Sequence, residues 1–188
     1  MSLSHSWKKN LAMIATLSRI AIAPVIMLIL IQPGNWAHWL SASLFVLASL
    51  TDWLDGYWAR KYHSQSVLGE LMDPIADKIL VLGPLLMLLS LGRVDALLVF
   101  LLLGRDIFIG GLRSAAAAEN IIIAAGPLGK WKTALQMISL TALLIYQPVF
   151  SLPLAQIGYV GLWVSVIFSL ASGAQYTWGY YQGPPAKG

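Results

Sequence analysis

Six long apolar stretches, separated by short polar or turn-forming segments, constrain this chain more than any other feature of its sequence. They cover residues 11–32, 36–58, 71–91, 96–118, 131–150 and 154–176. Each is close to the roughly 20 residues that an α-helix needs to cross the hydrocarbon core of a bilayer. Hydrophobic residues make up 58% of the chain and charged residues only 11%, which is far from the composition of a soluble domain. We therefore expect an all-α integral membrane protein with six transmembrane helices.

The whole chain, residues 1–188, is expected to form a single membrane domain, because no internal repeat or polar linker divides it. Residues 1–10 are expected to be a cytoplasmic N-terminal segment, and residues 182–188 a flexible tail. The first apolar stretch is predicted to be a retained helix rather than a signal peptide, because it is long and no small-residue cleavage site follows it. The absence of cysteine excludes disulfides and thiolate metal ligands.

The positions of lysine and arginine predict the orientation in the membrane, since positively charged loops face the cytoplasm. The opposite loops contain only Arg93. The N-terminus, the alternate loops and the tail contain Lys8, Lys9, Arg60, Lys61, Lys130, Lys132 and Lys187. Both termini are therefore predicted to be cytoplasmic.

Four aspartates lie together at the predicted cytoplasmic face: Asp52, Asp55, Asp73 and Asp77. They are half of the chain's eight acidic residues. Carboxylates at membrane depth are costly unless their charge is offset, so they indicate a functional site. Residues three or four apart share a face of a helix, so each pair would point one way and the two pairs would face each other. Because Mg²⁺ prefers hard oxygen ligands, we interpret the four carboxylates as a site for two divalent cations.

The residues around the aspartates suit a phosphorylated ligand. Gly56 and Ala59 leave room for a base or a phosphate to approach the helix backbone, and Arg60 would bind a phosphate. The alternative is that the aspartates are solvated loop carboxylates, paired with Arg60, Lys61 and Lys78. A pattern of eight specified positions that bridges two membrane helices favours the functional interpretation.

A second group of charged residues is cationic. Arg105 and Arg113 are eight residues apart, about two helical turns, and so share a face of the fourth apolar stretch. Buried arginines need anionic partners, which Asp106 would supply in part and a substrate phosphate in part. Lys130 and Lys132, at the start of the fifth stretch, either add to this pocket or merely follow the distribution of cytoplasmic charge.

Arg19 lies well inside the first apolar stretch. It either extends to the membrane interface, stabilises a lipid phosphate, or pairs with an aspartate. Snorkelling or structural pairing is favoured over direct contact with a substrate.

The aspartate pattern resembles the signature of the CDP-alcohol phosphotransferase family, D-x-x-D-G-x-x-A-R-x8-G-x-x-x-D-x-x-x-D, and the resemblance covers nearly the whole chain. It implies a six-helix fold with a cytoplasm-facing active-site cavity, usually homodimeric, in the bacterial inner membrane. It implies that the four aspartates bind two divalent cations, Mg²⁺ or Mn²⁺, and that Asp77 is also the general base. The donor site for the CDP group would comprise Asp52, Gly56, Ala59, Arg60 and Gly69.

Within that family, the segments 16–19, 112–113 and 129–136 look like those of bacterial members that use glycerol 3-phosphate. The resemblance implies transfer of a phosphatidyl group from CDP-diacylglycerol to glycerol 3-phosphate, giving phosphatidylglycerophosphate and CMP. The chain departs from the family pattern at Ala12-Met13 and at Asp106, where a proline with a polar residue and a glutamate are common. The acceptor phosphate would be bound by Arg105, Arg113, Lys130 and Lys132.

Two alternatives stay open. The acceptor could be phosphatidylglycerol, as in a cardiolipin synthase, or an inositol phosphate, although a bulky lipid acceptor would not need the cationic cluster. The chain could instead be a small ion-coupled transporter. That class would place its acidic residues near the bilayer midplane and show internal repeats, whereas these aspartates gather at one face.

Overall fold

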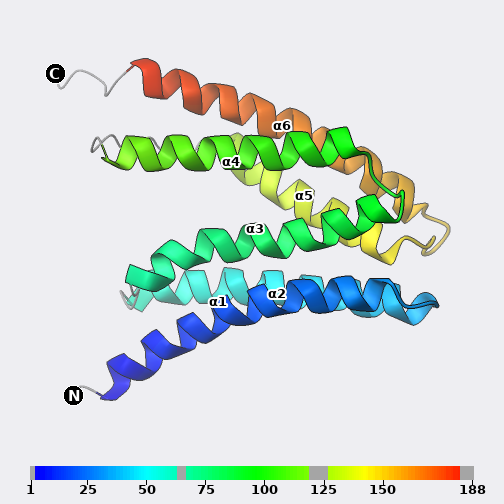
Figure 1. Cartoon of the computed structure of the whole chain (residues 1–188), viewed down its shortest axis with the longest axis horizontal. Helices are drawn as coiled ribbons and strands as arrows, with labels where there is room; N and C mark the ends of the chain where they lie inside the picture. The colour runs from blue at the N-terminus through cyan, green and yellow to red at the C-terminus, as the bar shows by residue number, and fades with distance from the viewer. Residues whose placement is uncertain (1–2, 63–66, 119–126, 183–188) are drawn as a thin grey trace. The chain divides into compact units, whose positions relative to one another are not determined.

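The computed structural model describes the backbone of residues 3–62, 67–118 and 127–182, and the side chains of residues 16–51, 72–118 and 128–181. The described residues form six helices: α1 (Leu3–Leu30), α2 (Asn35–Tyr62), α3 (Val67–Ser90), α4 (Ala96–Ala118), α5 (Pro127–Ile145) and α6 (Leu154–Gln182) (Figure 1). The predicted all-α class and the order of the helices are confirmed. Several helices are longer than the apolar stretches that predicted them, because polar residues continue the same backbone hydrogen bonding beyond the apolar part.

The first compact unit comprises Met1–Ser90 together with Leu144–Gln147. In it α1 packs against both α2 and α3, and α2 runs opposite to the other two helices (Figure 1). The buried residues of α1 recur every three or four positions, as expected for one face of a helix. That buried stripe consists of Thr16, Arg19, Ala23, Ile26 and Leu30. It is apolar toward the C-terminal end of α1 and polar at Thr16 and Arg19.

Helix α1 approaches α3 closely at Gly83. A Cβ atom placed on Gly83 would lie 3.3 Å from the Cβ of Ala23 and 3.2 Å from the sulfur of Met27. Small residues at such contacts are typical of packed membrane helices, which associate through close van der Waals contact. This contact holds α3 against the buried stripe of α1, so the position of α1 determines what lies beside the acidic residues of α3.

The second compact unit comprises Leu91–Leu143 together with Pro148–Gly188. Here α4 packs against α6, and α5 meets α6 at Gly158, where an added Cβ would lie 2.7 Å from the backbone oxygen of Ser139. The core of this unit is aliphatic, with Leu98, Leu102, Leu140, Leu143, Leu162 and Val166 buried. The close contact at Gly158 holds α5, the helix that carries Lys132, against α6.

Large apolar side chains are exposed along the described helices, including Leu28, Leu47, Phe100, Ile138 and Ile167. Extensive apolar exposure marks a surface that meets lipid or another protein. Among the described residues, the segment Leu154–Tyr181 is long and apolar enough to cross a membrane by length and composition, and Thr16–Leu30 is a shorter apolar helix. The crossing of the membrane by all six helices remains a prediction.

Candidate active site

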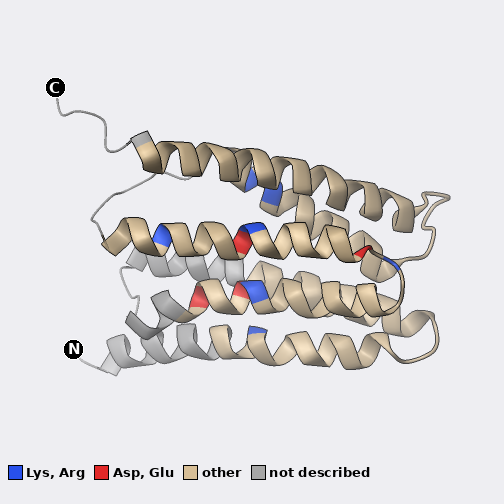
Figure 2. Ribbon diagram, turned by 45° about the horizontal axis from the view of Figure 1, so that its top comes forward, with Lys and Arg blue, Asp and Glu red and all other residues tan. Residues whose placement is uncertain are grey.

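Asp73 and Asp77 lie one turn apart on the N-terminal half of α3, as the sequence spacing predicted. Their side chains are 47% and 45% exposed. Charged residues are few in the described helices, and they lie mostly in small groups that contain both signs (Figure 2). The two aspartates therefore present accessible carboxylate surface on a helix that is mostly apolar.

Arg19 of α1 contacts both of these aspartates. Its Nη1 atom donates a hydrogen bond of 2.5 Å to Oδ1 of Asp77, and its Nη2 atom lies 3.6 Å from Oδ1 of Asp73. The arginine side chain is only 3% exposed. A buried guanidinium is stable only if anionic partners offset its desolvation, and Asp73 and Asp77 do so here. Of the three roles considered for Arg19, pairing with an aspartate is confirmed.

Thr16, one turn before Arg19, contacts one of these two aspartates. Its Oγ1 atom donates a hydrogen bond of 2.5 Å to Oδ1 of Asp73. The described hydrogen bonds from α1 thus engage the Oδ1 atom of each aspartate, one from a neutral donor and one from a charged donor. Thr16 was absent from the predicted site, although it occupies the same stripe of α1 as Arg19.

The other predicted residues of this site lie on helices whose side chains are outside the described part of the chain. Asp52, Asp55, Gly56, Ala59 and Arg60 belong to the C-terminal part of α2, and Gly69 belongs to the first turn of α3. Because α2 runs opposite to α3 and ends just before it, these residues are at the same end of the unit as Asp73 (Figure 1). Their roles in binding metal and the CDP group remain predictions.

The described carboxylates suit a divalent cation. Asp73 and Asp77 supply hard oxygen atoms from consecutive turns, and about half of each side chain is accessible. Among the residues whose side chains are described, no group of three or more potential protein ligands gathers around a point. A site built from this pair would therefore need further ligands, which is consistent with the prediction that Asp52 and Asp55 contribute.

In the second unit Asp106 binds two of the four cations predicted to hold an acceptor phosphate. The Nζ atom of Lys132 lies 2.8 Å from each carboxylate oxygen of Asp106, and Nη1 of Arg105 lies 3.1 Å from Oδ1. Lys132 is buried, whereas Lys130 is exposed. The sequence grouped the two lysines, but residues two apart on a helix point in different directions.

The two arginines of α4 share the face that meets α6, as predicted. Arg105 donates hydrogen bonds from Nε to the backbone oxygen of Ser169, at 2.8 Å, and from Nη2 to Oγ of Ser172, at 2.6 Å. The guanidinium carbon of Arg113 lies 5.2 Å from the ring centre of Tyr176, within cation–π range. Arg113 is exposed, so its charge is accessible to a ligand in a way that the charge of Arg105 is not.

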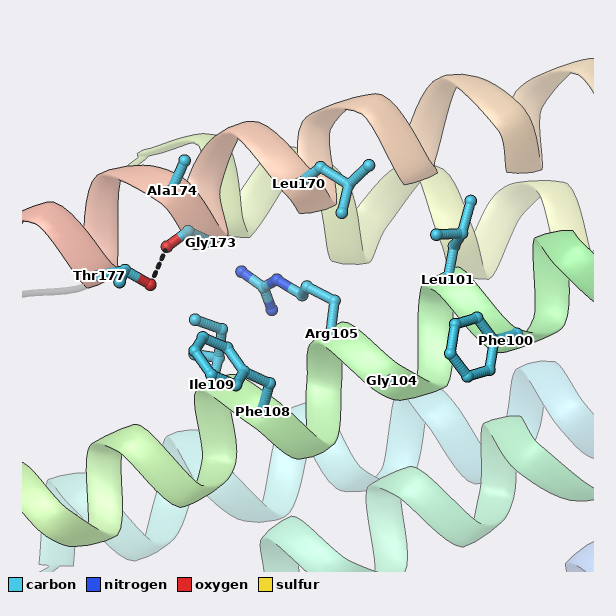
Figure 3. A pocket seen from close by; sticks show the side chains of 10 residues that line it. All are labelled: Phe100, Leu101, Gly104, Arg105, Phe108, Ile109, Leu170, Gly173, Ala174 and Thr177. Atoms are coloured by element: carbon cyan, nitrogen blue, oxygen red, sulfur yellow. Dashed lines mark hydrogen bonds between the residues drawn. The ribbon is translucent and has the colours of Figure 1, made fainter.

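A cavity of about 390 Å³ lies beside Arg105 between α4 and α6 (Figure 3). Its walls are mostly apolar, with Phe100, Phe108 and Leu170 among them, and Arg105 is the charged residue that lines it. Apolar walls next to one cationic group suit an amphipathic molecule better than a free sugar phosphate. A phosphate bound by Arg105 would have to displace or share the contact with Ser172.

This chain matches the family described as CDP-alcohol phosphatidyltransferase over residues 9–171. A Bacillus subtilis (strain 168) protein named CDP-diacylglycerol–glycerol-3-phosphate 3-phosphatidyltransferase is 37% identical over 179 residues, covering 89% of this chain and 93% of the relative. A Rickettsia typhi protein with the same name is 38% identical over 169 residues, covering 89% of this chain and 95% of the relative. A rice protein (Oryza sativa subsp. japonica) named cardiolipin synthase (CMP-forming) is 36% identical over 149 residues, covering 72% of this chain and 45% of the relative.

Proposed function

Because the chain belongs to the CDP-alcohol phosphatidyltransferase family, we propose that it transfers the phosphatidyl group of CDP-diacylglycerol to glycerol 3-phosphate. The products are phosphatidylglycerophosphate and CMP. The observation that carries the proposal is the pair of half-exposed carboxylates, Asp73 and Asp77, held by α1 within the region that the family matches. The two bacterial relatives, which match almost end to end, are named for this reaction.

In the proposed site Asp52, Asp55, Asp73 and Asp77 would hold two divalent cations, Mg²⁺ or Mn²⁺. When bound, such ions would neutralise charge on the oxygens of the phosphoryl group that is transferred and of the phosphate that leaves. Asp77 would accept the proton of the primary hydroxyl of glycerol 3-phosphate as that oxygen attacks the β-phosphorus of the donor. A new phosphorus–oxygen bond forms, the diphosphate bond breaks, and CMP leaves with the electron pair. No covalent enzyme intermediate is needed.

The predicted acceptor residues divide into two kinds. Arg113 and Lys130 are exposed, so they would contact the phosphate of glycerol 3-phosphate directly. Arg105 and Lys132 both pair with Asp106, and Arg105 also donates a hydrogen bond to Ser172 of α6. These two residues would therefore bind the phosphate only by sharing these contacts. Gly56, Ala59, Arg60 and Gly69, with Asp52, would line the site of the CDP group.

We further propose that the six helices cross the bacterial inner membrane, with both termini and the active site at the cytoplasmic face. The exposed apolar side chains on the described helices and the distribution of lysine and arginine support this topology. The acyl chains of the donor would then enter from the bilayer. A homodimer is proposed from the resemblance to the family.

A second candidate acceptor is phosphatidylglycerol, because the matching rice relative is named cardiolipin synthase. The cationic residues of the second unit favour the smaller acceptor. A free phosphomonoester can carry two negative charges, and a phosphodiester in a lipid carries one. An acceptor that contains a free phosphate group therefore makes better use of Arg113 and Lys130.

The test is the release of CMP by the purified full-length protein in detergent with Mg²⁺ and CDP-diacylglycerol. Glycerol 3-phosphate, phosphatidylglycerol, inositol phosphate and serine are compared as acceptors, and each assay is repeated with a chelator. We expect release that requires both the metal and glycerol 3-phosphate. Release with phosphatidylglycerol alone would make the chain a cardiolipin synthase. Release that persists in chelator would contradict the proposed metal site.

A further inference from the structure

Two residues of α1 contact the predicted catalytic aspartates, although neither belongs to the aspartate motif. Thr16 and Arg19 are 2% and 3% exposed, and they are the polar members of the buried stripe of α1 among the residues from 16 onward. Their hydrogen-bonding atoms meet Oδ1 of Asp73 and Oδ1 of Asp77, each at 2.5 Å. Polar groups this deeply buried must have partners, and here the partners come from a different helix.

We propose that Thr16 and Arg19 are positioning residues that fix the rotation of the Asp73 and Asp77 carboxylates toward the metal ions. The inference rests on the proposed function, because it assumes that these carboxylates bind metal. Each donor holds the Oδ1 atom of its carboxylate against α1, and about half of each aspartate side chain remains exposed. Partners of this kind around metal ligands commonly change metal affinity by about 10–100-fold when they are removed.

Arginine suits its position for a geometric reason. Its planar group reaches Asp77 through Nη1 and approaches Asp73 through Nη2, so one side chain sets the separation of both carboxylates. Lysine has a single charged nitrogen on a flexible chain, so it would retain the charge and lose the two-point contact. Arg19→Lys therefore separates the contribution of geometry from that of charge.

A substitution of Thr16 tests the contribution of geometry without any change in charge. The hydroxyl of Thr16 is neutral, so Thr16→Val removes a hydrogen bond to Asp73 and changes neither the charge nor much of the volume. A change in metal affinity in this variant would report on the orientation of Asp73. The matched control is Thr141→Val, because Thr141 donates its hydroxyl hydrogen to Met137 within its own helix, at 2.9 Å.

A competing explanation makes the opposite prediction. If Arg19 were a counter-ion that merely occupies the carboxylates until metal arrives, its removal would leave them more available and metal would bind more tightly. If Arg19 positions the carboxylates, its removal would weaken metal binding. The sign of the change in affinity therefore distinguishes the two roles, without any measurement of catalysis.

The experiment is Mn²⁺ binding, followed by electron paramagnetic resonance, to the full-length protein and its variants in detergent. We expect about 10-fold weaker binding for Thr16→Val, a larger loss for Arg19→Gln and an intermediate loss for Arg19→Lys. Thr141→Val and Arg93→Gln, which removes an arginine from the turn after α3, should bind Mn²⁺ as the unaltered protein does. Wild-type affinity in Thr16→Val and Arg19→Gln, or tighter binding in Arg19→Gln, would overturn the proposal.

Failure of the proposed function gives a different result. If the unaltered protein binds no Mn²⁺, the metal site and the positioning role both fail. If it binds Mn²⁺ and releases CMP, and the Thr16 and Arg19 variants match it, only the positioning role fails. Should Arg19→Gln fold poorly, the nearly isosteric Thr16→Val variant still decides. In the folded variants kcat at subsaturating metal should fall, with the KM for glycerol 3-phosphate unchanged.

Discussion

The two units of the chain balance their buried charges in opposite ways. Between α1 and α3, one buried arginine faces two half-exposed carboxylates, Asp73 and Asp77. Between α4 and α5, one carboxylate, that of Asp106, serves two cations, Arg105 and Lys132. In the ion pairs of the described side chains, carboxylates outnumber cations in the first group and cations outnumber carboxylates in the second. The first group is therefore suited to bind divalent cations, and the second is suited to bind the phosphate of the proposed acceptor.

The comparison also shows what a buried ion pair can contribute. Isolated pairs in a protein interior are weak evidence for stability, because desolvation offsets most of the attraction. In both groups the charges of the described ion pairs are unequal in number, which a purely structural pair would not need. We interpret the imbalance as the functional part of each group and the paired residues as the part that holds it in place.

The largest expected effect comes from removing the negative charge of Asp77. Asp77→Asn keeps the size of the side chain and an oxygen that can accept the Arg19 hydrogen bond, but it removes the proton acceptor. We expect CMP release to fall by about 10³-fold, with binding of CDP-diacylglycerol largely retained. Steady-state CMP release and a donor-binding assay measure the two quantities.

The control for Asp77→Asn is Asp95→Asn. Asp95 accepts a hydrogen bond from Tyr159 in the second unit and lies outside the proposed site. The Asp95→Asn variant should keep the activity of the unaltered protein if it folds. Normal turnover in Asp77→Asn would show that Asp77 is not the general base.

The next effect concerns stability in the second unit. Asp106→Asn leaves Arg105 and Lys132 without their shared anion, and removing one member of a buried pair is costly. Because Asp106 is 22% exposed, we expect a loss of about 2–3 kcal/mol, less than for a fully enclosed pair. The midpoint of thermal unfolding in detergent measures the loss.

A double-mutant cycle tests whether this loss belongs to the pair. In a Lys132→Met background the carboxylate no longer has Lys132 to neutralise, so Asp106→Asn should cost clearly less. Equal costs in the two backgrounds would show that Asp106 and Lys132 are not coupled. The Asp106–Lys132 pair could then not be compared with the Arg19 pairs of the first unit.

Much of the fold could be predicted from the sequence, because long apolar stretches between turn-forming residues indicate helices. The helical spacing of Asp73 and Asp77, and of Arg105 and Arg113, also predicted correctly which residues share a face. The ends of the helices could not be predicted from hydropathy. The polar residues at the end of α2, for example, continue the helix to Tyr62, beyond the apolar stretch.

The partners across helices were harder to predict, because periodicity says which face of a helix is buried and not what lies against it. Thr16 and Arg19 fall in register with Ala23, Ile26 and Leu30, so the sequence does contain the signal that they point inward. That they meet Asp73 and Asp77 depends on how α1 packs on α3. Likewise, only the packing of α5 shows that Lys132 is buried beside Asp106.

Helix packing also differs between the units, and matched glycine substitutions test the difference. An added Cβ on Gly158 would meet the backbone oxygen of Ser139 at 2.7 Å, whereas one on Gly83 would meet the flexible side chain of Met27 at 3.2 Å. Gly158→Ala should therefore cost about 2 kcal/mol, and Gly83→Ala less than about 1 kcal/mol. Thermal unfolding measures the loss of stability in both variants. Equal losses would show that helix packing at Gly158 is no tighter than at Gly83.

The smallest expected effect concerns Arg113 and the binding of the acceptor phosphate. Arg113 is exposed and stacks on Tyr176, so it adds accessible positive charge without joining the Asp106 pairs. We expect Arg113→Ala to raise the KM for glycerol 3-phosphate about 10-fold, with kcat nearly unchanged, because a phosphate remote from the reacting bond contributes equal binding in the ground and transition states. Arg113→Lys should lie between. An increase in KM confined to CDP-diacylglycerol would assign Arg113 to the donor, and the excess positive charge of the second unit would then serve the diphosphate instead of the acceptor.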